Sequence, residues 1–517
     1  MKSFRMLTVA AFAAATLPRL AQRGMFVDGV TYASIARNLS EGRGSFWSPS
    51  YTATIYPQFH EHPPFGFWLQ SLWFRVLGDH LFVERAYSLA AALVTALLIA
   101  RIWHRLQQSG AEGPAQACPE RSSVDRPGLS ETLIPRQAQD ERRVEGLRTS
   151  GRRDGPHVPG ASADEWLPVL FWILVPVVSW AIVGNLLETS LSLLTTAAVA
   201  AAVEAAFAAR PTSTAAWGIV SGVCVVAAAL TKGPVGLFPL AAPVMFWMIF
   251  GNRRAWASLV GQWSAVMLCA IALLSFEAPR ASLAQYLDQQ VFASLGGRRE
   301  ISAGSWTIVI QLVSGVWAPI VLAGGLIVAA AQRFVRPRQP QRAQAAALFL
   351  VGLAGTLPIA VSVKQAGHYL VPGVPLYALA AACLLAPTAA VLIERLAVRQ
   401  HERFVNSLSA VVLLVAIGVA YVPALRRDAP RLADLDVLAA GVPRGATIGI
   451  CPESNGDWGL HAWFERRFDV SLDAAGGPQR EWFLATAAPR VGCPPVDCTP
   501  ATDPNRQLVL MKCPRER

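Results

Sequence analysis

The chain has 517 residues, of which 53% are hydrophobic and 15% are charged, and its mean hydropathy is +0.38. Soluble proteins have about one-quarter charged residues, so this composition excludes an ordinary soluble domain and indicates a polytopic membrane protein. The net charge of +11 could reflect nucleic-acid binding, but it is typical of the Lys and Arg excess on the cytoplasmic side of membrane proteins, and we expect no nucleic-acid partner.

Eleven apolar stretches are long enough to cross a bilayer, which takes about 17–25 residues. The first follows Lys2 and Arg5, as in a secretory signal peptide, but we interpret it as an uncleaved span because Asp28 opens a polar loop directly after it. The stretches predict spans at residues 6–22, 83–103, 166–184, 187–209, 215–231, 234–251, 256–276, 306–331, 344–362, 368–393 and 407–424.

Residues 25–79, between the first two spans, are polar and unusually rich in aromatic residues. Aromatic side chains with a polar tip suit the membrane–water interface, so we predict an outer-face loop that contains an amphipathic helix. The loop holds one early carboxylate, Asp28, and later Tyr56 and the run Glu61-His62-Pro63-Pro64. These groups make the loop a candidate for half of an active site.

The short loops indicate the orientation, because Lys and Arg gather on the cytoplasmic side. With the N-terminus inside, the inside loops hold Arg210, Arg253, Arg254, Arg333, Arg336, Arg338, Arg342, Arg395, Arg399 and Arg403. The other side receives the 25–79 loop, a second polar loop at residues 277–305 and several polar residues at span ends. Such residues usually snorkel, but their shared side favours one common site facing the periplasm of a bacterial inner membrane.

Residues 105–165 are rich in Arg, Ser, Pro and Gly and lack apolar periodicity, which predicts a disordered cytoplasmic insertion. The run TLIPRQAQDERR resembles translated repetitive elements found inside some bacterial reading frames. A basic segment could instead contact nucleic acid or anionic lipid. We favour the insertion and expect deletion of residues 110–160 to leave activity intact.

Residues 425–517 predict a small periplasmic α/β domain, since the strand-like runs 446–451 and 507–513 flank an aromatic segment. An even number of cysteines outside the cytoplasm suggests two disulfides, and all three pairings remain open. Zinc binding is the alternative, although the spacing is not that of a zinc ribbon. The cysteines are Cys451, Cys493, Cys498 and Cys513.

Five segments in a fixed order carry a resemblance to a known family. They are the early Asp28, then YPQFHEHPPFGFWLQSLWFRVLGD, NLLETSLSLLTTAAVA, ALTKGPVGLFPLAAP and KQAGHYLVPGVPLYALA. Together they resemble the GT-C superfamily of membrane glycosyltransferases, in the branch of the lipid A aminoarabinose transferase and the protein mannosyltransferases. The resemblance covers about residues 1–400 apart from the insertion. It implies an all-α GT-C module over residues 1–424 with about 11–13 transmembrane helices.

The resemblance also implies transfer of a sugar from a polyprenyl phosphate to a hydroxyl acceptor, with inversion at the anomeric carbon. Asp28 matches the family's catalytic Asp, so we predict that it is the base that takes the acceptor's proton; the alternative is an N-cap for the following helix. The family often has an acidic pair here, whereas this chain has Asp28-Gly29. Glu188 matches a second acidic position that could orient the loop or the acceptor, with a helix-terminal charge as the alternative.

The leaving phosphate requires cations or hydrogen-bond donors that stabilise its developing charge. His62 stands where relatives often have Lys, and it binds phosphate as a cation only when protonated. Glu61 and His62 could instead hold a divalent metal, although we expect no required cofactor. Lys232 could simply snorkel at a turn. The predicted substrate-binding residues are Tyr56, Glu61, His62, Lys232, Arg298, Arg299, Lys364, His368 and Tyr369.

Two other functional classes compete with this prediction. A transporter or flippase of lipid-linked sugars should show polar groups near span midpoints, internal repeats and broken helices, whereas here the polar groups gather at one face. The third class is a non-catalytic assembly protein whose tail binds a partner. We predict a glycosyltransferase whose partners are a polyprenyl-phosphate sugar, membrane lipids and an acceptor that is a lipid, a glycan or a protein.

Overall fold

A computed structural model describes most of the chain outside the 105–165 segment. The predicted disordered insertion therefore lies, apart from its two ends, outside the described residues, and so does Arg299. The described residues are 2–111, 165–251, 255–298, 304, 306–396, 399–422, 427–439, 441–475, 480–486, 493, 497–504 and 506–514.

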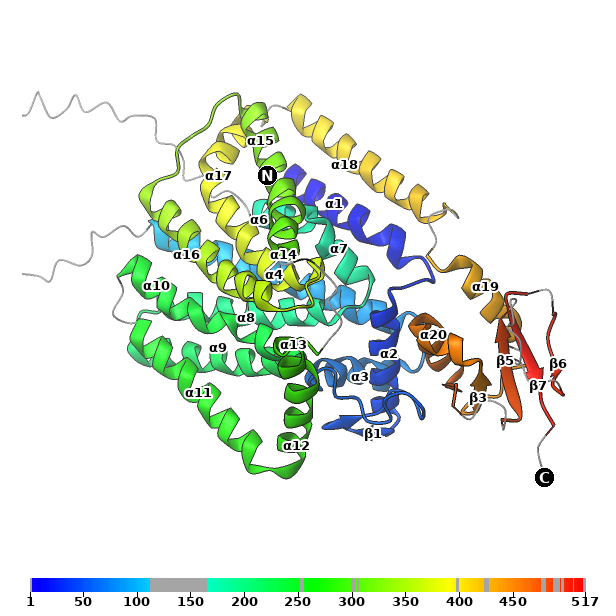
Figure 1. The fold of residues 1–517 in the computed structure, drawn as a ribbon. Coiled ribbons are helices and arrows are strands. Elements are labelled where there is room, and N and C mark those ends of the chain that lie inside the picture. The colour runs from blue at the N-terminus through cyan, green and yellow to red at the C-terminus, as the bar shows by residue number, and fades with distance from the viewer. Residues whose placement is uncertain are drawn as a thin grey trace, which may run out of the picture.

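Helical segments occupy all eleven predicted span positions and form one bundle (Figure 1). The α-helices of the bundle are α1 (Lys2–Leu20), α4 (Val83–Ala111), α6 (Trp166–Leu174), α7 (Pro176–Val183), α8 (Leu187–Ala206), α9 (Pro211–Lys232), α10 (Ala242–Phe250), α11 (Ala255–Ser275), α14 (Thr307–Gln311), α15 (Ala318–Ala331), α16 (Gln339–Thr356), α17 (Val374–Leu396) and α18 (Arg399–Ala420). Short 3₁₀ or π segments extend or join them: η2 (Gly233–Ala241), η4 (Leu312–Trp317), η5 (Leu357–Val361) and η6 (Gly367–Gly373).

By length and composition, eight helical runs in the described part of the chain could cross a membrane, or nine if the bent pair α6–α7 is one span. The bend of 77° falls where Pro176 begins α7, which the apolar pattern did not predict. The count of nine is lower than the predicted 11–13 for two reasons. Helix α1 is not included, and residues 211–250 are counted once although they hold two predicted spans.

The chain reverses direction inside that 40-residue run. Gly233 follows α9 with a φ of +71°, which a glycine adopts without strain. Phe250, at the end of α10, then lies with its ring centroid 5.8 Å from that of Phe207, near the start of α9. Helices α9 and α10 therefore run antiparallel, as two consecutive spans require.

Small residues set the close packing of α9, which lies between α8 and α11 (Figure 1). A Cβ on Gly218 or Gly222 would lie 2.4 Å from a backbone oxygen of α11, at Ser258 and Gln262 respectively. This four-residue glycine spacing is a common device for helix contact in membranes. Gln262 adds a hydrogen bond from its Nε2 to Ser221 Oγ at 2.9 Å.

One end of the bundle carries the two polar loops, and both contain helices. The 25–79 loop forms α2 (Val27–Ser40), the hairpin of β1 (Gly44–Ser45) and β2 (Ser48–Pro49), and α3 (Phe65–Leu77). The 277–305 segment forms α12 (Glu277–Tyr286), the π-helical η3 (Leu287–Phe292) and α13 (Ala293–Leu295).

The C-terminal region is a small α/β unit beyond α2 and α3 (Figure 1). Its five strands lie in the order β4-β3-β5-β7-β6; β3 runs parallel to β4 and β5, and β7 runs antiparallel to β5 and β6. The helices and strands are α19 (Ala429–Leu438), β3 (Thr447–Ile450), η8 (Pro452–Gly456), α20 (Trp458–Phe468), β4 (Ser471–Asp473), β5 (Trp482–Thr486), β6 (Thr499–Pro500) and β7 (Leu508–Lys512).

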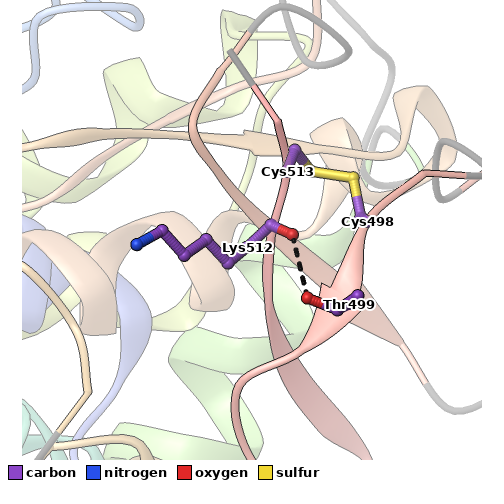
Figure 2. The surroundings of a disulfide bond; sticks show 4 residues. All are labelled: Cys498, Thr499, Lys512 and Cys513. Carbon is purple, nitrogen blue, oxygen red and sulfur yellow. Dashed lines mark hydrogen bonds between the residues drawn. A yellow bond between two sulfur atoms is a disulfide. The ribbon is translucent and has the colours of Figure 1, made fainter.

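Two disulfides close this unit and choose among the three pairings that the sequence left open. Cys451 bonds Cys493, and Cys498 bonds Cys513. Figure 2 shows the second bond at the edge of the sheet, beside a hydrogen bond from Thr499 Oγ1 to the carbonyl of Lys512 at 3.5 Å. With all four cysteines in disulfides, no thiolate in this group is left to bind zinc.

A set of polar and charged side chains, most of them buried, joins the C-terminal unit to α2, and we call Arg37, Asn38, Glu465 and Asp469 the interface cluster. The side chains of Arg37 and Glu465 are each 2% exposed, and Arg37 Nη2 lies 2.8 Å from Glu465 Oε1. Asn38 Nδ2 donates to the same oxygen at 3.1 Å, and Arg37 Nη1 donates to the carbonyl of Glu465 at 2.9 Å. These contacts attach the C-terminal unit to α2, the helix whose first turn holds Asp28.

Candidate functional site

Asp28 lies in the first turn of α2, one residue after the helix begins at Val27. Phe26 is the N-cap and makes no side-chain cap, so the alternative role of Asp28 as N-cap is wrong. Its carboxylate still benefits from the positive end of the helix dipole. Among the described residues Asp28 makes no hydrogen bond or ion pair through its side chain.

The backbone around Asp28 is fixed by a close contact with the turn between α7 and α8. A Cβ on Gly29 would lie only 1.7 Å from the carbonyl oxygen of Gly184, so only glycine fits. Asn185 Nδ2 donates to the carbonyl of Gly29 at 3.0 Å, and Gln70 Nε2 donates to Asn185 Oδ1 at 3.0 Å. A second acidic side chain at position 29, next to Asp28, therefore cannot be accommodated without moving α2 or this turn.

Glu188, Lys232 and His368 form a second group, which we call the site cluster. Glu188 stands in the first turn of α8 with its side chain 1% exposed, and Lys232 is the last residue of α9. Lys232 Nζ and His368 Nε2 lie 2.5 Å and 3.4 Å from Glu188 Oε1. Lys232 Nζ also lies 5.0 Å from the ring centroid of Tyr369, a cation–π contact.

A cavity of about 540 Å³ opens beside the site cluster, and we call it the first cavity. One part of its wall is polar and ionisable, formed by Glu61, His62, Glu188, Lys232, Lys364 and Tyr369. Another part is apolar and comes from the spans, with Leu191, Val235, Leu237, Phe238 and Ile359. The first cavity therefore presents two lysines, beside two carboxylates, next to a wall that suits a hydrocarbon tail.

The charges at this end act on Asp28, although Asp28 does not line the first cavity. Burial is the largest influence and raises the pKa of Asp28 above its ordinary value. Lys232 opposes this rise, while the negative charge of Glu188 adds to it. Asp28 and the site cluster thus share one electrostatic environment.

The loop residues Glu61 and His62 are held by tyrosines. Tyr56 Oη donates to Glu61 Oε1 at 2.9 Å, and Tyr32 Oη lies 3.1 Å from His62 Nε2. Within the described residues no three His, Cys, Asp or Glu side chains are grouped to hold a metal ion. The two predicted metal ligands each have a tyrosine partner.

The remaining predicted residues are placed differently. Arg298 does not line the first cavity; its side chain is 63% exposed and pairs with Asp288 at 3.3 Å. Tyr56 is near Glu61 but does not line the first cavity.

Three polar lining residues of the 277–305 segment were missed by the sequence analysis: Tyr286, Gln290 and Ser294. They recur at every fourth position in residues 277–305, so helical spacing was a signal that could have found them. Tyr286 Oη donates to the carbonyl of Lys232 at 3.4 Å, which links this segment to the site cluster.

Comparison with solved structures identifies the architecture. The structure of ArnT from Cupriavidus metallidurans bound to undecaprenyl phosphate matches with a TM-score of 0.59 and 14% identity, covering 98% of this chain and 97% of that one. The apo form of the same protein matches with a TM-score of 0.58 and 14% identity, over 97% and 95%. The archaeal oligosaccharyltransferase AglB from Archaeoglobus fulgidus matches with a TM-score of 0.49 and 11% identity, over 94% and 69%.

Sequence comparisons find less. No protein-family model matches the chain, and no curated protein matches it. The likeness to ArnT therefore rests on the course of the whole chain, which the two proteins share from end to end. The chain is a multi-pass membrane protein with the GT-C fold, as the resemblance in its sequence predicted.

Proposed function

We propose that this protein transfers a sugar from a polyprenyl phosphate to a hydroxyl group of an acceptor. The observation that carries the proposal is the first cavity, in which Lys232 and Lys364 stand beside an apolar wall made by membrane spans. A polyprenyl phosphate has this combination of anionic head and long apolar tail. The fold supports the same reading, because a structure with this fold was solved with undecaprenyl phosphate bound.

The chemistry requires one base and one set of cations. Asp28 takes the proton of the acceptor hydroxyl as its oxygen attacks the anomeric carbon of the donor. The bond from that carbon to the phosphate oxygen breaks, and the electron pair leaves with the phosphate. Lys232 and Lys364 stabilise the charge that develops on this leaving group. Attack opposite the leaving phosphate gives inversion.

Glu188 has a supporting role in this mechanism. Its contact with Lys232 keeps the ammonium group at the cavity wall, and its negative charge raises the pKa of Asp28, which makes Asp28 a stronger base. We assign Glu188 as a positioning residue and Asp28 as the catalytic residue. The Arg-rich loops at the opposite end favour reaction at the periplasmic face of the inner membrane.

The test is turnover of lipid-linked sugars by purified protein. A panel of radiolabelled polyprenyl-phosphate sugars is incubated with extracted cell envelope as acceptor, and release of polyprenyl phosphate is measured for wild type and Asp28→Asn. We expect one sugar to turn over and the variant to lose about 10²- to 10⁴-fold, the usual contribution of a general base.

Asp288→Asn is the matched control, because Asp288 is exposed and lines neither cavity of this end of the bundle. Equal turnover by wild type and a folded Asp28→Asn variant would reject Asp28 as the base. Transport of a lipid-linked sugar without release of polyprenyl phosphate would instead support a flippase.

A further inference from the structure

A second cavity of about 720 Å³ lies next to the first. Its walls come from the 25–79 loop, through Tyr56, His60 and Glu61, and from α12 and η3, through Gln285, Gln289 and Gln290. Glu61 and Gln290 line both cavities, so the two are separated by little more than these side chains. A ligand in the second cavity would therefore lie directly beside a donor head group in the first.

Specific contacts hold the wall of the second cavity that the 25–79 loop forms. His60 is buried, and its Nδ1 lies 3.2 Å from Ser282 Oγ of α12, which ties the loop to the opposite wall. Tyr56 has a φ of +51°, in the left-handed region that is unfavourable for a bulky side chain. Strain of this kind persists where the surrounding structure imposes it, and it concentrates at functional sites.

An aromatic pair adds a third element to this end of the molecule. The ring of Tyr56 stacks on that of Trp458 of α20, with centroids 6.4 Å apart and planes inclined by 20°. Trp458 is 51% exposed, although it lies in the small α/β unit and not in a membrane span. An exposed aromatic face beside polar groups suits a ligand that is apolar on one face and hydroxylated at its edges.

The chemistry of the second cavity differs from that of the first. Four glutamine amides, of Gln58, Gln285, Gln289 and Gln290, supply both donors and acceptors, and Glu61 supplies acceptors. None of the described residues that line the second cavity is Lys or Arg. A phosphorylated lipid head group would find no countercharge there, whereas sugar hydroxyls can both donate to and accept from these groups. The π-helical geometry of η3, which presents Gln289 and Gln290, is itself frequent at functional sites.

We propose that the second cavity binds the acceptor, and that this acceptor is a neutral carbohydrate held by Gln285, Gln289 and Gln290 against the Tyr56 loop. The inference rests on the proposed function and narrows it from lipid, glycan or protein to glycan. An acceptor hydroxyl that reaches past Glu61 and Gln290 attacks the anomeric carbon of the donor. Its proton passes to Asp28, and the polyprenyl phosphate leaves through the first cavity.

The experiment has a transfer arm and a binding arm. In the transfer arm, purified protein receives the donor identified with cell-envelope extract, and neutral oligosaccharides are compared with phosphorylated lipid glycans and Ser/Thr peptides as acceptors. In the binding arm, saturation-transfer NMR detects contact of the same oligosaccharides with the protein in detergent. Both arms use wild type, Gln289→Ala and the neighbouring control Asp288→Ala.

We expect transfer to a neutral oligosaccharide. Loss of one amide hydrogen bond should raise the acceptor KM about five- to tenfold in Gln289→Ala, leaving the donor KM unchanged. Asp288→Ala should behave as wild type. A merely structural effect of Gln289→Ala would change both KM values or the thermal stability, and would overturn the assignment.

The two proposals fail in different ways. Donor turnover with envelope extract, combined with neither transfer to nor binding of any neutral oligosaccharide, overturns the carbohydrate site and leaves the glycosyltransferase standing. Absence of turnover with every donor and acceptor overturns the proposed function. In that case oligosaccharide binding that weakens in Gln289→Ala still supports a carbohydrate site, and its absence rejects the site as well.

Discussion

The interface cluster and the site cluster both bury opposite charges, but they differ in how completely their hydrogen bonds are made. In the interface cluster Arg37 donates through Nε, Nη1 and Nη2, and Glu465 Oε1 accepts from both Arg37 and Asn38. In the site cluster Glu188 Oε2 is buried and, among the described residues, has no hydrogen-bond partner. Among the described residues, no buried side-chain atom of the interface cluster lacks a hydrogen-bond partner. The site cluster leaves one carboxylate oxygen without a partner at the wall of a cavity.

The difference separates a structural role from a functional one. A satisfied buried network rigidifies the elements that it joins, here α2 and α20. An unsatisfied buried polar group carries a penalty that native proteins usually avoid, so its presence calls for an explanation such as a bound ligand. Four variants or conditions test this contrast.

The largest effect is expected for Arg37→Met. The change leaves Glu465 buried without its cationic partner, which should destabilise the protein by about 3–5 kcal/mol. Thermal unfolding in detergent measures the loss. Turnover measured well below the unfolding temperature should fall less than about tenfold, since the site cluster is untouched. A stable Arg37→Met variant without turnover would show that the interface cluster acts in the reaction.

Lys232→Met should have the next largest effect, on activity. Removal of a preorganised cation at the leaving group should lower turnover about 10²- to 10³-fold. The double variant Glu188→Gln/Lys232→Met removes both charges, so it should recover stability without recovering turnover. Recovery of turnover in the double variant would mean that the site cluster is only structural.

The acid limb of the pH–rate profile should report Asp28. The base acts only when deprotonated, and burial raises its pKa, so activity should be present above the raised pKa and fall about tenfold per pH unit below it. Because Lys232 lowers the pKa of Asp28, Lys232→Met should move the limb to higher pH. A limb at or below the ordinary Asp pKa, measured as kcat/KM against pH, would contradict this environment for Asp28.

The smallest effect is expected for Arg43→Ala. Arg43 pairs with Asp469 and Glu41 at the rim of the interface cluster, but its side chain is 37% exposed. Exposed ion pairs contribute about 0–1 kcal/mol, so the melting temperature should barely change. A loss as large as that of Arg37→Met would mean that burial does not distinguish the two arginines.

Much of the fold could be predicted because apolar runs report spans directly. The predicted spans 83–103 and 187–209 coincide with α4 and α8, and the strand-like runs 446–451 and 507–513 became β3 and β7. The bend at Pro176 and the intervening strands β4, β5 and β6 were missed. The strands depend on tertiary packing, which a single apolar pattern does not encode. The bend follows from Pro176, a local signal that an apolar pattern does not register.

The candidate site was predictable in part. Polar residues at span ends on one side predicted that Glu188, Lys232 and His368 share an end of the bundle, and the structure places them in contact. The same reasoning cannot rank loop residues, because a loop can turn a side chain either way. Arg298 was expected at the substrate and instead pairs with Asp288, whereas Gln290 lines both cavities and was missed.

The most direct test of the central claim is the affinity of the purified protein for polyprenyl phosphate and for the matching polyprenol. The two ligands share the apolar chain and differ only in the anionic head that Lys232 and Lys364 should bind. We predict that polyprenyl phosphate binds at least about tenfold more tightly and that Lys232→Met removes most of this difference. Equal affinity for the two ligands in wild type would contradict the assignment of the first cavity.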